Sequence, residues 1–352
     1  MFSQITFSRK SAALSLAMVG ALSTAETSRA ANLDHFTEPF RTVYAVTETN
    51  DLYTFDVHTQ QTTFVHAING LQPGESIRGI DLSRLPWNQP SLDPMRLMMV
   101  GSTGRLYQMR LDAGPQQFVT TLTGATGLDL SSGSVGFDTF EQYTVGNYYR
   151  AVTSSAGGYR GVPSSPAGEG HLGTTRYPDG SPASVVGLAA PDDAPSYFPG
   201  WHILGLEANE AKLVGLDPFW PTPPDGLGAG KVQALADVRG PGGSMLDLAH
   251  LAGFDMQEVL DLRNGFFQTL IGVAAFNSPS SNYTELYAVD LSWTPSFGNP
   301  PGTVEFRKIA DMTLDSRTSV RFTAVAMTPT PGAATFAAPL AMLAIRRRRP
   351  NS

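Results

Sequence analysis

The 352-residue sequence contains no cysteine, which excludes disulfide bonds, thiolate zinc sites, iron–sulfur clusters and a cysteine nucleophile. Charged residues are scarce as well: they make up 16% of the chain, and their formal balance at pH 7 is −7. A chain with this acidic excess lacks the basic surface on which nucleic-acid binding depends. Regular helical periodicity is missing between the two ends, so the sequence does not encode a helical bundle.

Glycine and proline are abundant by contrast, with 35 and 26 residues. Both favour turns, and their share of the chain is above ordinary usage. Hydrophobic residues make up 41% of the sequence, which is enough for a substantial core. The composition therefore predicts many short strands joined by turns, either in one large all-β domain or in two domains of average size.

The first 30 residues have the features of a secretory signal peptide. Arg9 and Lys10 precede a mostly apolar stretch at 11–24, which is shorter than a membrane span of about 20 residues. Small residues allow cleavage after Ala25 or after Ala30. We expect a cleaved signal, and an uncleaved N-terminal anchor is the alternative.

The segment 329–352 combines a proline-rich break, a short apolar run and a terminal arginine cluster. The break contains Pro329 and Pro331, and the apolar run covers 333–345. The cluster consists of Arg346, Arg347, Arg348 and Arg349. These arginines favour a cytoplasmic position for the C-terminus. The arrangement resembles the PEP-CTERM sorting signal, although Pro-Thr-Pro-Gly stands where that family has Pro-Glu-Pro. The resemblance implies recognition by an exosortase-like enzyme and delivery to the cell surface; a plain tail anchor is the alternative.

A repeat of about 50 residues runs through 41–328. Val46 and Val100 are 54 positions apart, and so are Tyr53 and Tyr107. Further copies begin near Arg150, Ile203 and Leu270. Each copy has the pattern of a strand, a tight turn and a second strand.

Two further strands are expected after each hairpin. Third strands are predicted at 62–68, 116–122, 232–238 and 304–309. Fourth strands, often with a Gly-x-Asp sequence, are predicted at 78–82, 135–138, 185–188, 252–255 and 323–326. We therefore expect an all-β protein, a β-propeller of five blades with four short antiparallel strands each, in which the last strand closes the ring with the first three. A β-sandwich or two β-domains are the alternatives, with 157–181 as a degenerate blade or a domain boundary.

Part of the repeat resembles a family of bacterial secreted domains of unknown function. Members repeat Gly-x-Leu-Tyr-x-Leu-Asp and Gly-Phe-Asp-Phe-Asn-Pro around a propeller-like body. The matching residues here are 104–107, Gly-Arg-Leu-Tyr, and 136–138, Gly-Phe-Asp, without the following Asn-Pro. The resemblance implies export and a propeller, and it brings no catalytic residues with it.

Three aspartates, Asp81, Asp138 and Asp255, occupy equivalent places in the predicted fourth strands. If they line a central channel, they could together bind Ca²⁺, which prefers oxygen ligands. They could instead accept hydrogen bonds from backbone N–H groups as a device of the fold, or act as paired carboxylates of a glycosidase. The sequence has no zinc-helix, phosphate-loop or nucleophile-elbow motif, so no catalytic residue is assigned and no cofactor is required.

Aromatic residues in proline-rich loops are the second group of candidates. The tryptophans among them are Trp87, Trp201, Trp220 and Trp293. Flat rings on one face of a propeller suit sugar rings or peptide strands, whereas buried rings would fill the space between blades.

Together these features predict an exported bacterial cell-surface propeller that binds or scaffolds extracellular or envelope material without catalysis. Its expected partners are the export machinery, an exosortase-like sorting enzyme, and a polysaccharide or envelope-protein ligand, with no nucleic acid. A polysaccharide-active enzyme, either a glycoside hydrolase or a lyase, is the alternative. A purely structural surface-layer component is a third.

Overall fold

The computed structural model describes residues 42–83, 96–111, 119–121, 130–131, 133–142, 146–153, 158–161, 171–173, 175–190, 203–216, 232–261, 267–279, 282–291, 302–315 and 318–327. The predicted signal peptide (1–30) and sorting segment (329–352) lie outside these ranges, as do the four candidate tryptophans. Within the described ranges, no helix has the length and apolar character needed to cross a bilayer.

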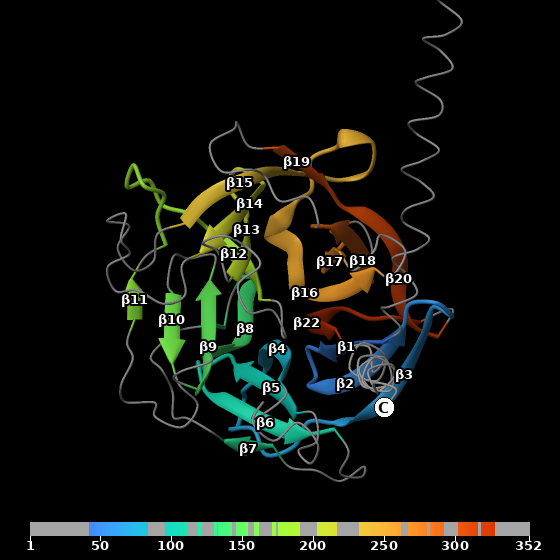
Figure 1. Cartoon of the computed structure of the whole chain (residues 1–352). Coiled ribbons are helices and arrows are strands. Elements are labelled where there is room, and N and C mark those ends of the chain that lie inside the picture. The colour runs from blue at the N-terminus through green and yellow to red at the C-terminus, as the bar shows by residue number, and fades with distance from the viewer. Residues whose placement is uncertain are drawn as a thin grey trace, which may run out of the picture.

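Strand pairing among the described residues gives five sheets, which Figure 1 shows arranged around a common centre. The first sheet has the order β22-β1-β2-β3, formed by Phe322–Met327, Thr42–Thr47, Asp51–Asp56 and Gln61–Ala67. The second has the order β4-β5-β6-β7, formed by Ile77–Ser83, Arg96–Gly101, Leu106–Arg110 and Thr120–Thr121. The third has the order β11-β10-β9-β8, formed by His171–Gly173, Gly158–Gly161, Gly146–Thr153 and Val135–Gln142.

The two remaining sheets have five strands each. One has the order β12-β13-β14-β15-β19, formed by Val185–Ala189, Ile203–Glu207, Lys212–Leu216, Val232–Arg239 and Gly302–Glu305. The other has the order β16-β17-β18-β20-β21, formed by Leu251–Asp261, Phe267–Asn277, Thr284–Asp290, Arg307–Asp315 and Thr318–Ser319. Two short 3₁₀ turns, Pro241–Gly243 and Leu248–His250, precede β16. The protein is thus all-β, with antiparallel sheets in a propeller arrangement.

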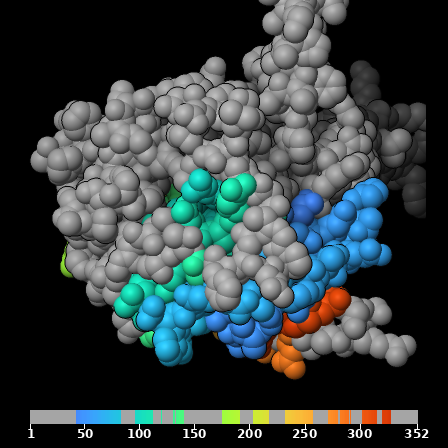
Figure 2. All heavy atoms as spheres, turned by 90° about the horizontal axis from the view of Figure 1, so that it is seen from below, coloured from blue at the N-terminus to red at the C-terminus, as the bar shows by residue number. Residues whose placement is uncertain are grey.

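The two ends of the described chain share one sheet. β22 pairs antiparallel with β1, with Ala45 opposite Val325 and Tyr44 opposite Ala326. In Figure 2 the red residues from the end of the chain lie against the blue residues from its beginning. The hydroxyl of Thr62 in β3 also donates to the carbonyl oxygen of Thr313 in β20. The predicted closure by the last strand is therefore present, and it covers edges that an open arrangement would leave unpaired.

The innermost strand of each sheet is one of the predicted fourth strands. These strands contact one another in the order β4, β8, β12, β16, β22 and back to β4. β4, β8, β12 and β16 each pair with the hairpin that follows in the chain, as β4 does with β5 and β16 with β17. β22 is the last strand and pairs with the first hairpin, through β1. The predicted unit ends with its fourth strand, whereas in the structure this strand begins the next sheet, so that sheets and sequence repeats differ by one strand.

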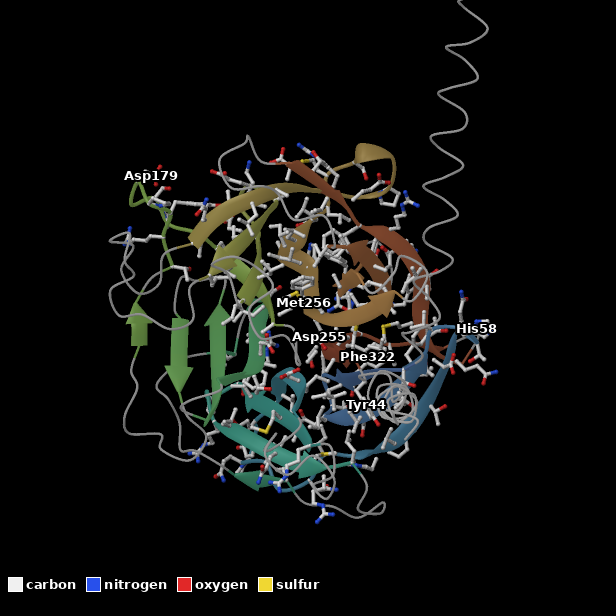
Figure 3. The ribbon with its side chains drawn as sticks, viewed as in Figure 1. Tyr44, His58, Asp179, Asp255, Met256 and Phe322 are labelled. Atoms are coloured by element: carbon white, nitrogen blue, oxygen red, sulfur yellow. The ribbon has the colours of Figure 1, made fainter. Side chains whose placement is uncertain are left out.

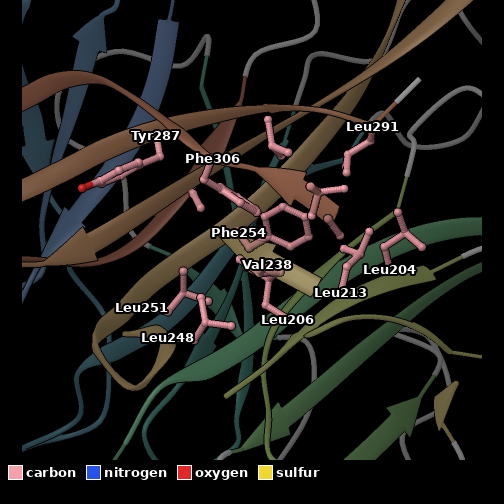
Figure 4. Packing of buried hydrophobic residues seen from close by; sticks show 14 of the residues in the cluster. Leu204, Leu206, Leu213, Val238, Leu248, Leu251, Phe254, Tyr287, Leu291 and Phe306 are labelled. Carbon is pink, nitrogen blue, oxygen red and sulfur yellow. The ribbon is translucent and has the colours of Figure 1, made fainter. Parts of the chain in front are cut away.

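The apolar core lies between neighbouring sheets. The largest cluster joins the β12–β15 sheet to the β16–β18 sheet, and it includes Leu206, Val238, Phe254 and Phe306 (Figure 4). Other clusters join the sheets of β18 and β1, of β1 and β4, and of β5 and β8. Because strands bury side chains on both faces here, long apolar runs replace a simple alternation, as the fully buried pattern of β12 illustrates.

Two sequence expectations need correction or completion. The predicted third strand at 304–309 is in fact divided at Phe306, since β19 pairs in parallel with β15 while β20 pairs with β18 of the next sheet. The backbone N–H of Phe306 donates to the carbonyl oxygen of Arg239, which ties this crossing point to β15. The weakly patterned stretch at 157–181 supplies β10 and β11 to the sheet that starts with β8.

Candidate functional site

The Gly-x-Asp sequence has a packing reason, because each innermost strand lies close to the next one. A Cβ atom added at Gly79 would lie 2.4 Å from the Cβ atom of Phe137, a distance that real side chains do not show. The glycine of one strand thus makes room for the middle residue of the next strand's triplet. The same relation holds for three pairs: Gly79 with Phe137, Gly187 with Phe254, and Gly253 with Val325.

The aspartate of the triplet bridges two innermost strands. The Oδ1 atom of Asp255 accepts the backbone N–H of Met256 over 2.7 Å, and Oδ2 accepts the N–H of Met327 in β22 over 2.6 Å. Figure 3 places Asp255 and Met256 near the centre of the ring, far from His58 and Asp179 at its rim. Asp255 therefore fastens β16 to β22, its next neighbour around the ring.

Asp81 makes the same bridge between β4 and β8. Its Oδ1 accepts the N–H of Leu82 over 2.7 Å, and its Oδ2 accepts both the N–H of Thr139, over 2.9 Å, and the hydroxyl of Thr139. The equivalent residues in β12 and β22 are Ala189 and Ala326, which offer no side-chain acceptor. Two aspartates thus satisfy four strand N–H groups that would otherwise be buried without partners.

The three aspartates come together in a buried group. Asp81, Asp138 and Asp255 expose 3%, 1% and 9% of their surface. Burial raises the pKa of Asp81, while hydrogen bonds from Thr139, Leu82 and the Asp138 side chain counter the shift. Burial, and next the negative charge of Asp81, raise the pKa of Asp255 to about 8. A hydrogen bond between the carboxyl groups of Asp81 and Asp138 requires that one of them carries a proton.

This hydrogen bonding bears on the predicted Ca²⁺ site. The oxygens of Asp81 and Asp255 accept strand N–H groups, and Ca²⁺ is bound by six to eight oxygen ligands. Among the described residues, no group of three or more His, Asp or Glu side chains is arranged to hold a metal ion. The hydrogen bonds of Asp81 and Asp255 support the alternative interpretation of the aspartates as a device of the fold, and the Ca²⁺ site stays a prediction.

A pocket of about 190 Å³ opens where the innermost strands begin. We call it the central pocket; its walls include Glu48, Arg78, Arg321 and Thr323, together with residues 133–135 and 249–252. Residues from β4, β22 and the segments leading into β8 and β16 meet there. The Ser134 hydroxyl donates to the carbonyl oxygen of Ala249 over 3.1 Å, which links the segments before β8 and β16.

Bulges in the innermost strands orient the pocket wall. In β4, Ile77 pairs with Gly101 and Gly79 with Val100, so that Arg78 is an extra residue between them. Such bulges change the direction of a side chain and are common beside functional sites. The corresponding extra residues in three other innermost strands are Val186 in β12, Ala252 in β16 and Thr323 in β22. β8 pairs with β9 without such a shift.

Two guanidinium groups and one carboxylate are the charged groups among the described residues that line the central pocket. Arg78 donates through Nη2 to the carbonyl oxygen of Gly133, and burial lowers its pKa while Glu48 counters the shift. Arg321 donates through Nη2 to the carbonyl oxygen of Ser278 over 3.5 Å. His250 lies with Nε2 3.4 Å from the Oδ2 atom of Asp247. The pocket is therefore biased toward negatively charged groups.

Sequence reasoning did not single out Arg78, Arg321 or Glu48, because isolated charged residues carry no motif. One signal was available for Arg78: the other residues immediately before the glycine position are uncharged. They are Val135, Val186, Ala252 and Thr323. The candidate tryptophans lie outside the described residues, so their predicted role stays a prediction.

The fold and the pocket define a class: an all-β protein with sheets in a propeller arrangement and a small charged pocket where the innermost strands begin. No family model and no curated protein matches the sequence. Two solved structures are similar, described as BBS1N in complex with ARL6DN, soaked with mercury in one case and with lead in the other. They share 12% identity with TM-scores of 0.35 and 0.33, over 71% and 69% of this chain. The chain spans 61% and 59% of the length of those chains.

Proposed function

We propose that this chain is an exported bacterial cell-surface protein whose propeller body binds or scaffolds envelope material without catalysis. The body is a ring of five blades over 41–328, one blade for each sheet. The five sheets, the cyclic order of contacts among innermost strands and the apolar clusters between sheets support this blade count. Export by the signal at 1–30, and surface delivery by an exosortase-like enzyme acting on 329–352, belong to the same proposal and rest on the sequence.

The observation that carries the non-catalytic proposal is the hydrogen bonding of the repeated aspartates. A retaining or inverting glycosidase needs two carboxyl groups that reach the substrate from opposite sides of the bond. The carboxyl oxygens of Asp81 and Asp255 accept backbone N–H groups and are buried away from solvent. This counts against a glycoside hydrolase or lyase that uses these carboxylates, and the charged central pocket favours binding.

An envelope polysaccharide is the proposed ligand, with the aromatic loops as its binding surface. The full chain should bind at least one envelope polysaccharide on a glycan array, and a Trp201→Ala, Trp220→Ala double variant should lose about tenfold in affinity, because two flat platforms for sugar rings disappear. Phe64→Ala is the matched control: it removes an aromatic side chain that is 54% exposed on β3, outside the proline-rich loops.

The control variant should bind as the unmodified chain does. Absence of binding to every polysaccharide and envelope fraction would remove the ligand from the proposal. Equal losses in the double variant and in Phe64→Ala would show that aromatic surface in general, rather than the proposed loops, is responsible.

A further inference from the structure

Arg78 differs in chemical type from the residues at the same position of the other repeats, and it lines the central pocket. Four innermost strands carry an uncharged residue immediately before the glycine position, and only β4 carries a guanidinium group there. A device of the fold recurs in every repeat, whereas a binding site needs an asymmetric group at one place. The shared fold of the innermost strands therefore does not explain why β4 has an arginine at this position.

The hydrogen bonding of Arg78 is incomplete. Its Nη2 atom donates to the carbonyl oxygen of Gly133, which holds the guanidinium against the pocket wall. Its Nε atom is buried and has no hydrogen-bond partner among the described residues. Leaving a buried donor of a charged group unpaired costs free energy, and an anionic oxygen would remove that cost.

The size and the charge of the central pocket restrict the ligand. Its volume of about 190 Å³ is below the range of about 300–1,000 Å³ that holds drug-sized ligands. At about 30 Å³ per water molecule it has room for about six waters, or for one small charged group. Arg321 adds a second positive charge to the wall, and among the described residues that line the pocket Glu48 is the one carboxylate.

We propose that the central pocket binds the oxyanion group of a ligand, a carboxylate or a phosphate, between Arg78 and Arg321. This inference deepens the proposed function and rests on it, since an acidic sugar of an envelope polysaccharide would supply such a group. The guanidinium groups recognise the oxygens of the anion, while Glu48 limits the affinity by repulsion.

The test is a calorimetric titration of the full chain with inorganic phosphate, with glucuronate and with neutral glucose. We expect saturable binding of phosphate or glucuronate and no binding of glucose. The anion that binds more tightly shows whether the pocket prefers a phosphate or a carboxylate group. Arg78→Gln and Arg321→Gln should each weaken binding about tenfold or more, because each removes a charge-assisted hydrogen bond. Glu48→Gln should tighten binding by about two- to fivefold, because it removes a like charge from the wall.

Arg239→Gln is the matched control, because Arg239 is an ion-paired arginine on β15, outside the pocket. It should leave anion binding unchanged.

Arg78→Lys keeps the charge and should bind the anion more tightly than Arg78→Gln does. If Arg78→Gln fails to fold, the affinities of Arg321→Gln and Glu48→Gln still test the proposal. Absence of saturable binding for both anions, or equal affinities in the pocket variants and in the unmodified chain, would overturn the proposal.

The outcomes also separate this inference from the proposed function. Binding of polysaccharide that depends on the tryptophans but not on Arg78 or Arg321 would leave the proposed function standing and refute the anion pocket. Anion binding in the pocket without binding of any polysaccharide would leave the anion pocket standing and refute the polysaccharide ligand of the proposed function.

Discussion

Unfolding of the protein should require more free energy at pH 5 than at pH 8. The folded-state pKa of Asp255 is about 8, raised by burial first and by Asp81 second, and burial also raises the pKa of Asp81. In the unfolded chain an aspartate titrates near pH 3.9. Between these values the folded protein binds more protons than the unfolded chain, so stability is lost as the pH rises through the folded-state pKa. At about 1.4 kcal/mol per pKa unit, the effect is on the order of a few kcal/mol.

The measurement is urea unfolding at several pH values between 5 and 8, on the unmodified chain and on Asp255→Asn. The variant removes one titrating group of the buried set and should flatten the pH dependence, while it also lowers stability because one N–H acceptor is lost. Asp237→Asn is the control, because it makes the same substitution at a partly exposed aspartate outside the buried group. A hydrogen bond from Lys212 lowers the pKa of Asp237, so its contribution is lost only at more acidic pH.

Asp237→Asn should therefore keep the slope of the unmodified protein between pH 5 and 8. An identical slope in Asp255→Asn would contradict the assignment of the pH dependence to the buried aspartates.

Replacement of Gly79 by alanine should destabilise the protein by about 3 kcal/mol. The new methyl group would lie 2.4 Å from the Cβ atom of Phe137 and 3.1 Å from Val100, so β4 and β8 would have to move apart. Overpacking of a well-filled core costs about 1–3 kcal/mol, and here the nearest atom is fixed to the backbone and cannot rotate away. The free energy of unfolding from urea titrations at one pH measures the effect.

Gly74→Ala adds the same methyl group at a position with no atom within 4 Å, but with a φ of +76°. It should cost about 1 kcal/mol, from the left-handed backbone alone. The comparison separates crowding between innermost strands from backbone strain. If Gly79→Ala were no more destabilising than Gly74→Ala, the close approach of the two strands would not be the reason for the glycine.

The Gly-x-Asp triplet shows how far sequence patterns reach in this protein. The repeat of Gly79 and Asp81 at Gly136 and Asp138 predicted equivalent strands, and the structure shows β4 and β8 as equivalent strands of two sheets. The pattern did not predict that Asp81 would bridge to Thr139 of the next strand, because a hydrogen bond between neighbouring sheets leaves no periodic signal. The division of the 304–309 stretch was missed for a similar reason: β19 pairs in parallel with β15, a strand distant in sequence.

The sequence by itself determined the hairpins, the Gly-x-Asp strands and the closure by the last strand, since the alternation and turn residues that predict the strands are close together in the chain. Only the tertiary structure decided which carboxyl oxygen accepts which N–H, and that Arg78 and Arg321, near opposite ends of the body, face one pocket. The physical reason is that closing the ring brings the first and last innermost strands together. The chemistry at the centre therefore depends on contacts between residues far apart in the chain, and local pattern does not report these.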